Sequence, residues 1–169
     1  MPALPVELFR RLTNGVYVVT ASHEGRQGGF TAAWLTQVSF DPLLVAVSIN
    51  PGNATWSLIE KSRRFAINVL AAGQQEAARH FGLTSGRDRD KLSTVRTHMS
   101  PDGAVVLADA VSWLDCRVEQ QTSAGDHRVV IARVVGGELL DRHAASLRYS
   151  ETGDMDGSAA LYPPRFPDG

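Results

Sequence analysis

The chain has 169 residues, of which 43% are hydrophobic and 21% charged, a composition typical of one globular domain that buries a core. Its formal net charge is -1 and its Lys and Arg residues are scattered, so no basic stripe is present to bind a nucleic acid. The longest apolar stretch, residues 43–49, is far shorter than the roughly 20 residues of a membrane-spanning helix. The amino-terminal residues have neither a basic leader nor an apolar core ahead of a cleavage site, so we expect a cytoplasmic protein.

The cysteine and histidine content leaves little scope for a disulfide or a metal site. Cys116 is the only cysteine, and it lies in a segment with the alternating pattern of a strand, so we expect a buried core residue instead of a redox thiol. The histidines stand singly along the chain and form no spaced group of ligands. We therefore expect no protein-bound metal.

The first half of the chain is predicted to consist of strands separated by short helices. Runs rich in Val, Ile and aromatic residues predict strands, and the Asp41-Pro42 dipeptide predicts a turn between two of them. Ser57 and Glu60 have the spacing of a capping box, and Gly82 is a candidate helix cap. In chain order, we expect a helix over residues 6–12, strands over 15–22, 30–39 and 42–49, a helix over 55–62, a strand over 65–70 and a helix over 74–81.

The second half is predicted to contain a charged segment, a long hairpin and a tail. Charged residues crowd residues 86–97, which is typical of a solvated loop or a short helix. Two β segments, 110–122 and 128–135, are joined by residues 123–127 and predict a hairpin. The prolines that follow Tyr162 preclude regular structure and predict an extended tail over residues 150–169.

Together these elements predict a single domain over residues 1–169 that is mainly β, with about six or seven strands and a few short helices. Strands do not alternate with long helices, so we expect an antiparallel barrel with attached helices and no parallel sheet. The chain also lacks a GxGxxG or Walker-type glycine loop. A bound nucleotide would therefore have to be held by the barrel itself.

Several segments of the chain, taken in order, resemble the flavin reductase-like family. They are Thr13-Asn-Gly-Val-Tyr-Val-Val-Thr20, Gly29-Phe-Thr-Ala32, Val38-Ser-Phe-Asp-Pro-Leu-Leu44, Phe65-Ala-Ile-Asn-Val-Leu70 and Asp90-Lys-Leu92. The third segment departs from the family pattern at Leu43, which replaces a second proline. The resemblance covers residues 6–149 and implies an antiparallel Greek-key split barrel that binds FMN, generally as a homodimer.

A further motif, Gly125-Asp126-His127, resembles the gly-asp-his of family members that reduce flavin with nicotinamide cofactors. In those proteins the histidine lies near the nicotinamide, so the resemblance makes His127 a candidate for positioning the pyridine nucleotide. The alternative interpretation is an ordinary hairpin turn, because Gly and Asp both suit tight turns.

The resemblance also implies which residues would contact FMN. They are Thr31, Ala32, Ala33, Trp34, Ser39, Ser48, Ile49, Asn50, Asn53, Thr55, Phe81 and Gly82. The two alanines would let the isoalloxazine ring approach the backbone, and the loop over residues 50–55 would offer the amides of a helix start to the phosphate. Each of the two serines is equally well read as an ordinary strand hydroxyl.

The phosphate charge needs a further source. Asn53 stands where family members often carry a basic side chain, so backbone amides, Arg87 or Lys91 would have to meet that charge. Tyr149 lies near the place of a family aromatic residue that is close to the site, although the sequence departs from the family after it.

Three functions are compatible with these features. The first is an NAD(P)H-dependent flavin reductase, which transfers a hydride to flavin N5 and would supply reduced flavin to a monooxygenase; NADH and NADPH are equally acceptable donors, and FAD is the alternative to FMN. The second is a flavoredoxin-like electron carrier with tightly bound FMN and a protein redox partner. The third is a flavin-binding protein without turnover. In each case we expect a homodimer, with Trp34, Trp56 and residues 161–166 as candidate contacts.

Overall fold

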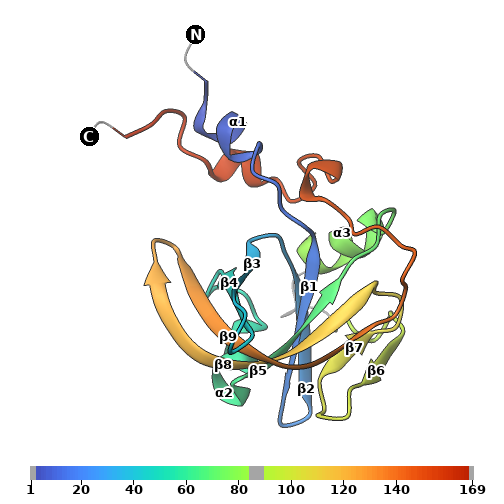
Figure 1. Cartoon of the computed structure of the whole chain (residues 1–169). Helices are drawn as coiled ribbons and strands as arrows, with labels where there is room; N and C mark the ends of the chain where they lie inside the picture. The colour runs from blue at the N-terminus through green and yellow to red at the C-terminus, as the bar shows by residue number, and fades with distance from the viewer. Residues whose placement is uncertain (1–2, 84–89, 168–169) are drawn as a thin grey trace.

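The computed structural model describes residues 3–83 and 90–167 and is dominated by antiparallel β structure (Figure 1). Its strands are β1 (Tyr17–His23), β2 (Arg26–Ala32), β3 (Leu35–Ser39), β4 (Leu44–Ile49), β5 (Arg64–Val69), β6 (Thr97–Met99), β7 (Val105–Leu107), β8 (Ser112–Ala124) and β9 (His127–Leu139). Its helices are α1 (Pro5–Phe9), α2 (Trp56–Ser62) and α3 (Gln75–Leu83), with 3₁₀ helices η1 (Tyr149–Glu151) and η2 (Ser158–Leu161). The predicted fold class, mainly β and antiparallel with a few short helices, is confirmed.

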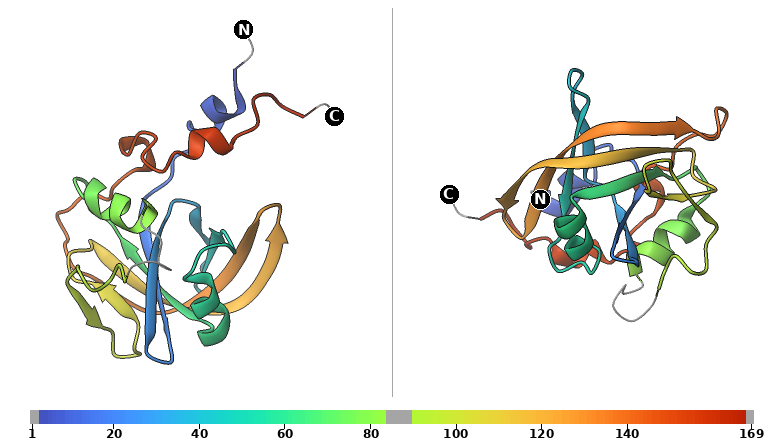
Figure 2. Two further views of the ribbon diagram at one scale, coloured as in Figure 1. Left: turned by 180° about the vertical axis from the view of Figure 1, so that it is seen from behind. Right: turned by 90° about the horizontal axis from the view of Figure 1, so that it is seen from below.

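Seven of the strands form one sheet in the order β2-β1-β5-β8-β9-β4-β3, and β6 pairs with β7 separately. The two edge strands, β2 and β3, are joined by only Ala33 and Trp34. The sheet therefore has to curl until its edges come near each other, and the curvature is evident in both views of Figure 2. The result is a barrel that stays split between β2 and β3.

Two apolar clusters cover opposite faces of the sheet. Val19 belongs to the first cluster, which gathers side chains of β1, β2, β4, β5, β8, β9 and α2. The neighbouring Val18 belongs to the second, which includes side chains of α3, β7 and residue Leu147. Successive residues of a strand point to opposite faces, so β1 is buried on both of them. Cys116 lies in the first cluster and is fully buried, as predicted.

The predicted strand over residues 30–39 is interrupted. Its alternating pattern continues through Ala33 and Trp34, but there the chain leaves β2 at one edge of the sheet and enters β3 at the other. The turn expected at Asp41-Pro42 is present between β3 and β4. The pattern of apolar residues reports which face is buried, and it does not report that the strand changes its partner.

The helix boundaries correct two of the predictions. The capping box is wrong: α2 begins at Trp56, so Ser57 lies inside the helix, where its hydroxyl donates to the carbonyl of Ala54 over 3.2 Å. Gly82 does not cap α3 either, because the helix continues through it to Leu83.

The hairpin is longer than predicted, and its connection is shorter. Strands β8 and β9 have 13 residues each and are joined by only Gly125 and Asp126. The short strands β6 and β7 were not predicted. In the charged segment we expected solvated side chains, but Lys91 is buried. Its ammonium donates to the carbonyl of Phe81 over 2.9 Å. Residues 84–89 of that segment lie outside the described residues.

The last described residues fold back and do not form a uniformly extended tail. They include η1 and η2, and they pack beside α1 on one side of the barrel (Figures 1 and 2). Arg10 Nη2 donates to Asp154 Oδ1 over 2.7 Å, and the rings of Phe9 and Tyr162 lie with centroids 5.7 Å apart. We call α1 together with residues 149–162 the terminal arm. None of the helices in the described ranges combines the length and apolar character needed to cross a membrane.

Candidate functional site

A cavity of about 450 Å³ lies between the terminal arm and the strands β3, β4 and β9. Its volume is within the range of small-molecule sites, and its walls are mainly apolar and aromatic, which suits a flat ring system. Its lining comprises Phe9, Arg10, Leu12, Asn14, Trp34, Leu35, Thr36, Ala46, Val47, Ser48, Val129, Tyr149, Ser158 and Tyr162.

Two of the sequence-predicted FMN residues, Trp34 and Ser48, meet in this cavity. The backbone N–H of Ser48 donates to the carbonyl of Trp34 over 2.9 Å, so the connection between β2 and β3 is bonded to β4. Trp34 is 49% exposed and lines the cavity. Part of the cavity wall is therefore built from two segments that the family resemblance assigned to FMN.

His127 lies beside Trp34 at the tip of the β8–β9 hairpin. Gly125 adopts a positive φ of 61° in the turn that brings the histidine there, which a glycine accommodates without strain. The register of β4 with β9 pairs Ile49 with Arg128, so the hairpin tip is next to the end of β4. The centroids of the imidazole and indole rings are 4.8 Å apart, with the planes inclined by 48°.

The orientation of the imidazole is further defined by Asp126. His127 Nδ1 lies 2.7 Å from Asp126 Oδ1. The hydrogen bond from His127, followed by the attraction of its charge, lowers the pKa of the Asp126 carboxyl. The carboxylate can only accept a hydrogen bond, so we assign the proton to Nδ1. The other ring nitrogen, Nε2, does not take part in the contact with Asp126.

The loop over residues 50–55 is largely closed upon itself. Asn50 Oδ1 accepts from the N–H of Gly52 over 2.8 Å, and Asn53 Oδ1 accepts from the N–H of Thr55 over 2.9 Å. Amides that we expected to face a phosphate are thus bonded to side chains within the loop. The Nδ2 groups of Asn50 and Asn53 are the donors that these two side chains still offer.

Other predicted contacts lie elsewhere in the fold. Thr31 donates its hydroxyl to the carbonyl of Ala78 over 2.6 Å, which joins β2 to α3 near Gly82. Ala32, Ile49 and Phe81 are buried in the two apolar clusters, so their side chains face the core. Ser39 pairs with Leu44, at the opposite end of β3 from Trp34. Ala33 follows Ala32 in the connection to β3 and is partly buried.

Of the two suggested cations, Arg87 lies outside the described residues and Lys91 is buried. Burial lowers the pKa of the Lys91 ammonium, which lines a recess of about 30 Å³ together with Thr55 and Gly28. The structure therefore places Lys91 near the start of α2 and away from the cavity that Trp34 lines.

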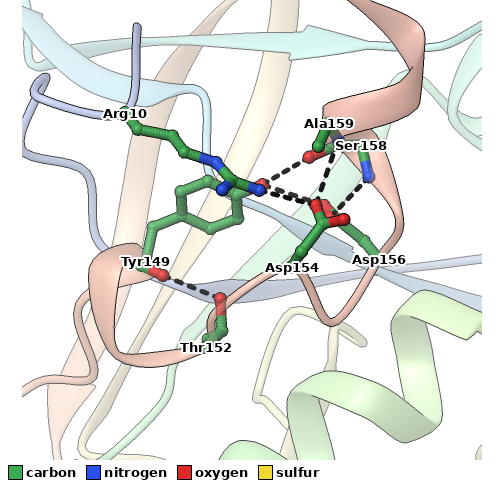
Figure 3. A network of polar contacts seen from close by, with 7 residues as sticks. All are labelled: Arg10, Tyr149, Thr152, Asp154, Asp156, Ser158 and Ala159. Atoms are coloured by element: carbon green, nitrogen blue, oxygen red, sulfur yellow. Dashed lines mark hydrogen bonds and ion pairs between the residues drawn. The ribbon is translucent and has the colours of Figure 1, made fainter. Parts of the chain in front are cut away.

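The far wall of the cavity is a polar network in the terminal arm (Figure 3). The hydroxyl of Tyr149 donates to Asp156 Oδ2 over 3.0 Å and lies 2.9 Å from Ser158 Oγ. Burial raises the pKa of Tyr149, while the hydrogen bond with Ser158 acts in the opposite direction. The backbone N–H of Ala159 donates to Asp154, whose carboxylate also binds Arg10.

Sequence reasoning missed most of this wall. Phe9, Arg10 and Tyr162 come from the two ends of the chain, and no local motif marks them as neighbours.

In the described part of the chain, no three His, Cys, Asp or Glu side chains are arranged to hold a metal ion.

Comparison with known proteins places these features in a wider group. The family described as "Flavin reductase like domain" matches residues 9–157. A flavin reductase of Pseudomonas putida is 32% identical over 148 residues, which are 87% of this chain and 84% of that protein. The structure of the NADH:FAD oxidoreductase SgcE6 of Streptomyces globisporus C-1027 superposes with a TM-score of 0.79 at 27% identity, covering 95% of this chain and 90% of that one.

The chain also matches one part of larger flavoproteins. Diflavin flavoprotein A 1 of Synechocystis sp. is 30% identical over 130 residues, which are 76% of this chain and 23% of that protein. The chain thus spans about a quarter of the length of the diflavin flavoproteins that it matches.

Proposed function

Because the chain belongs to the flavin reductase-like family, we propose that it is an NAD(P)H-dependent flavin reductase. Similarity to a flavin reductase along most of both chains, and to the fold of an NADH:FAD oxidoreductase, supports this proposal. Neither similarity selects between NADH and NADPH, and the proposal covers both donors. A flavin-dependent monooxygenase is the proposed consumer of the reduced flavin.

The observation that carries the proposal is the meeting of Trp34, Ser48 and His127. Trp34 and Ser48 line the cavity and His127 contacts Trp34, so the histidine nominated for the nicotinamide lies beside the segments nominated for the flavin. A hairpin turn without function would not need to lie against a cavity wall. Proximity of this kind is what hydride transfer between two bound rings requires.

The cavity is best suited to the isoalloxazine ring of FMN. Its apolar walls and the indole of Trp34 suit the isoalloxazine, and Ser48 would supply a polar contact at the ring edge. The Nδ2 groups of Asn50 and Asn53 are the proposed donors to the phosphate, with FAD as the alternative cofactor. When bound, the flavin supplies a hydride acceptor at N5. The protein residues bind, orient and exclude water.

We also propose a homodimer. Several large apolar side chains of the terminal arm and its surroundings are exposed, including Leu8, Phe9, Leu161 and Trp34. A second copy would cover such a surface. Trp56 is not available for this contact, because it is buried in the first apolar cluster. Light scattering at micromolar concentration should give about twice the mass of 18.3 kDa.

One observation favours the electron-carrier alternative. The indole of Trp34 covers part of the His127 ring, and the His127 side chain is only 20% exposed. If this cover excludes a pyridine nucleotide, the flavin would have to receive electrons from a protein partner. The similarity to a small part of the diflavin flavoproteins is compatible with such a role.

The test is a stopped-flow experiment on the protein reconstituted with FMN. We expect NADH or NADPH to bleach the flavin absorbance within seconds, and free FMN or FAD to be reduced with multiple turnovers. If the bound flavin is reduced only by photochemistry and then passes its electrons to a redox protein, the electron-carrier alternative is favoured. Failure to bind FMN or FAD at all would refute both functions.

A further inference from the structure

The imidazole of His127 is held from two directions. The indole of Trp34 lies against the ring with centroids 4.8 Å apart, and Nδ1 is 2.7 Å from the carboxylate of Asp126. These contacts come from different parts of the chain, since Trp34 follows β2 and Asp126 precedes β9. A side chain fixed by a ring contact and a directional hydrogen bond has few orientations left.

Trp34 is itself anchored to the barrel. Its carbonyl accepts from the N–H of Ser48 on β4, and the next residue, Leu35, begins β3 and pairs with Val47. Asp126 has no comparable support, because its side chain is 93% exposed at the hairpin tip. Of these two partners of the imidazole, Trp34 is therefore the one that is anchored to the sheet.

We propose that Trp34 is the positioning residue of His127, holding the imidazole beside the cavity so that Nε2 is presented to the nicotinamide nucleotide in a fixed orientation. This inference rests on the proposed reductase function. Trp34 acts through His127 in this proposal, and direct contact with the nucleotide is not required. The hydrogen bond to Asp126 selects which nitrogen faces the nucleotide, and the indole keeps the ring in place.

The proposal predicts an effect on nucleotide binding. Without the indole, the imidazole has to be ordered each time a nucleotide binds, and the cost of ordering one such side chain corresponds to roughly a two- to tenfold loss of affinity. Trp34→Leu should therefore raise the KM for NADH or NADPH by this factor, measured with the flavin site saturated. Trp34→Phe keeps an aromatic ring and should restore most of the affinity.

A double-mutant cycle separates positioning from other roles of Trp34. In the His127→Ala background there is no imidazole to position, so Trp34→Leu should have no further effect on KM. An equal effect of Trp34→Leu in both backgrounds would show that the indole contacts the nucleotide directly or only supports the fold, and would overturn the proposal.

A second readout does not depend on activity. In ¹H–¹³C spectra of the flavin-loaded protein, the ring protons of His127 should be displaced by the indole ring current and should move toward random-coil positions in Trp34→Leu. His23, which ends β1 and whose Nε2 lies 3.8 Å from Glu24 Oε1, should keep its signals and serves as the internal control.

The two readouts distinguish the possible failures. If the wild type is not reduced by NADH or NADPH while the His127 signals respond to Trp34→Leu, the reductase function fails and the contact between the rings stands. If the His127 signals are unchanged in Trp34→Leu, the positioning proposal is overturned even if the protein is an active reductase.

Discussion

The guanidinium of Arg64 on β5 donates to the carboxylate of Asp115 on the neighbouring strand β8 over 2.9 Å. The Asp115 side chain is only 2% exposed, and its second oxygen, Oδ1, has no hydrogen-bond partner within the described residues. A buried carboxylate is costly unless it is paired. Arg64 is therefore the side chain that keeps this charge compatible with the core.

Arg64→Met should destabilise the protein by about 2 kcal/mol, because it leaves the Asp115 carboxylate buried without its partner while the partly exposed position of Arg64 moderates the loss. The matched control is Arg133→Met, which breaks the more exposed pair with Glu119 and should cost less than about 1 kcal/mol. Urea unfolding measures both. Equal losses would mean that burial of Asp115 has no special importance.

Two adjacent glycines of β9 should differ in how well they tolerate alanine. A Cβ at Gly137 would lie 2.6 Å from the carbonyl oxygen of Trp113, whereas one at Gly136 would meet nothing nearer than Asp115 Cβ at 3.9 Å. Gly137→Ala should therefore cost about 1–3 kcal/mol, because the backbone of β8 has to move. Gly136→Ala should stay within about 0.5 kcal/mol of wild type. The order of the two melting temperatures checks this, and a reversed order would contradict it.

His127→Ala should slow flavin reduction by NADH or NADPH by about tenfold, equivalent to about 1.4 kcal/mol of transition-state stabilisation. FMN affinity should barely change, since the proposed flavin contacts lie on other segments. His23→Ala removes a histidine from the β1–β2 hairpin and is the matched control. Stopped-flow traces and fluorescence titration measure rate and affinity separately. A wild-type rate in His127→Ala would leave the histidine as an ordinary turn residue.

Cys116 should resist thiol reagents in the folded protein. Burial, followed by the charge of Asp115, raises the pKa of its thiol, so the reactive thiolate is disfavoured. The folded state keeps this proton more tightly than the unfolded chain, so its contribution to stability is present below about pH 8.5 and declines as pH rises above that value. Labelling at pH 8 should appear only after urea is added. Rapid labelling without urea would show that the residue is accessible.

Local chemistry explains which elements were predictable. The β8–β9 hairpin follows from Gly125 and Asp126 between two long β segments, and β1 follows from its run of β-branched residues. The break at Ala33 and Trp34 has no local signal, because it depends on the pairing of β3 with β4. Strands of three residues, such as β6, depend on a partner and leave too short a pattern to recognise.

The site was predictable to a similar extent. Trp34, Ser48 and His127 could be nominated from motifs, but their meeting depends on the register of Ile49 with Arg128, which no motif contains. The aromatic wall from Phe9 and Tyr162 requires the two ends of the chain to pack together. Nothing in the sequence indicated that Asn50 and Asn53 bond to amides of their own loop, a preference that competes with any ligand.

The sheet order has a consequence for how the protein is made. Strands β4 and β5 follow each other in the chain, yet they never pair, because the β8–β9 hairpin lies between them. During synthesis both strands leave the ribosome with an open edge, and each has to wait for a partner more than forty residues later in the chain. A nascent chain that stops before β9 would expose such edges to neighbouring chains, which favours aggregation. The hairpin that carries His127 is thus also the last element needed to complete the sheet.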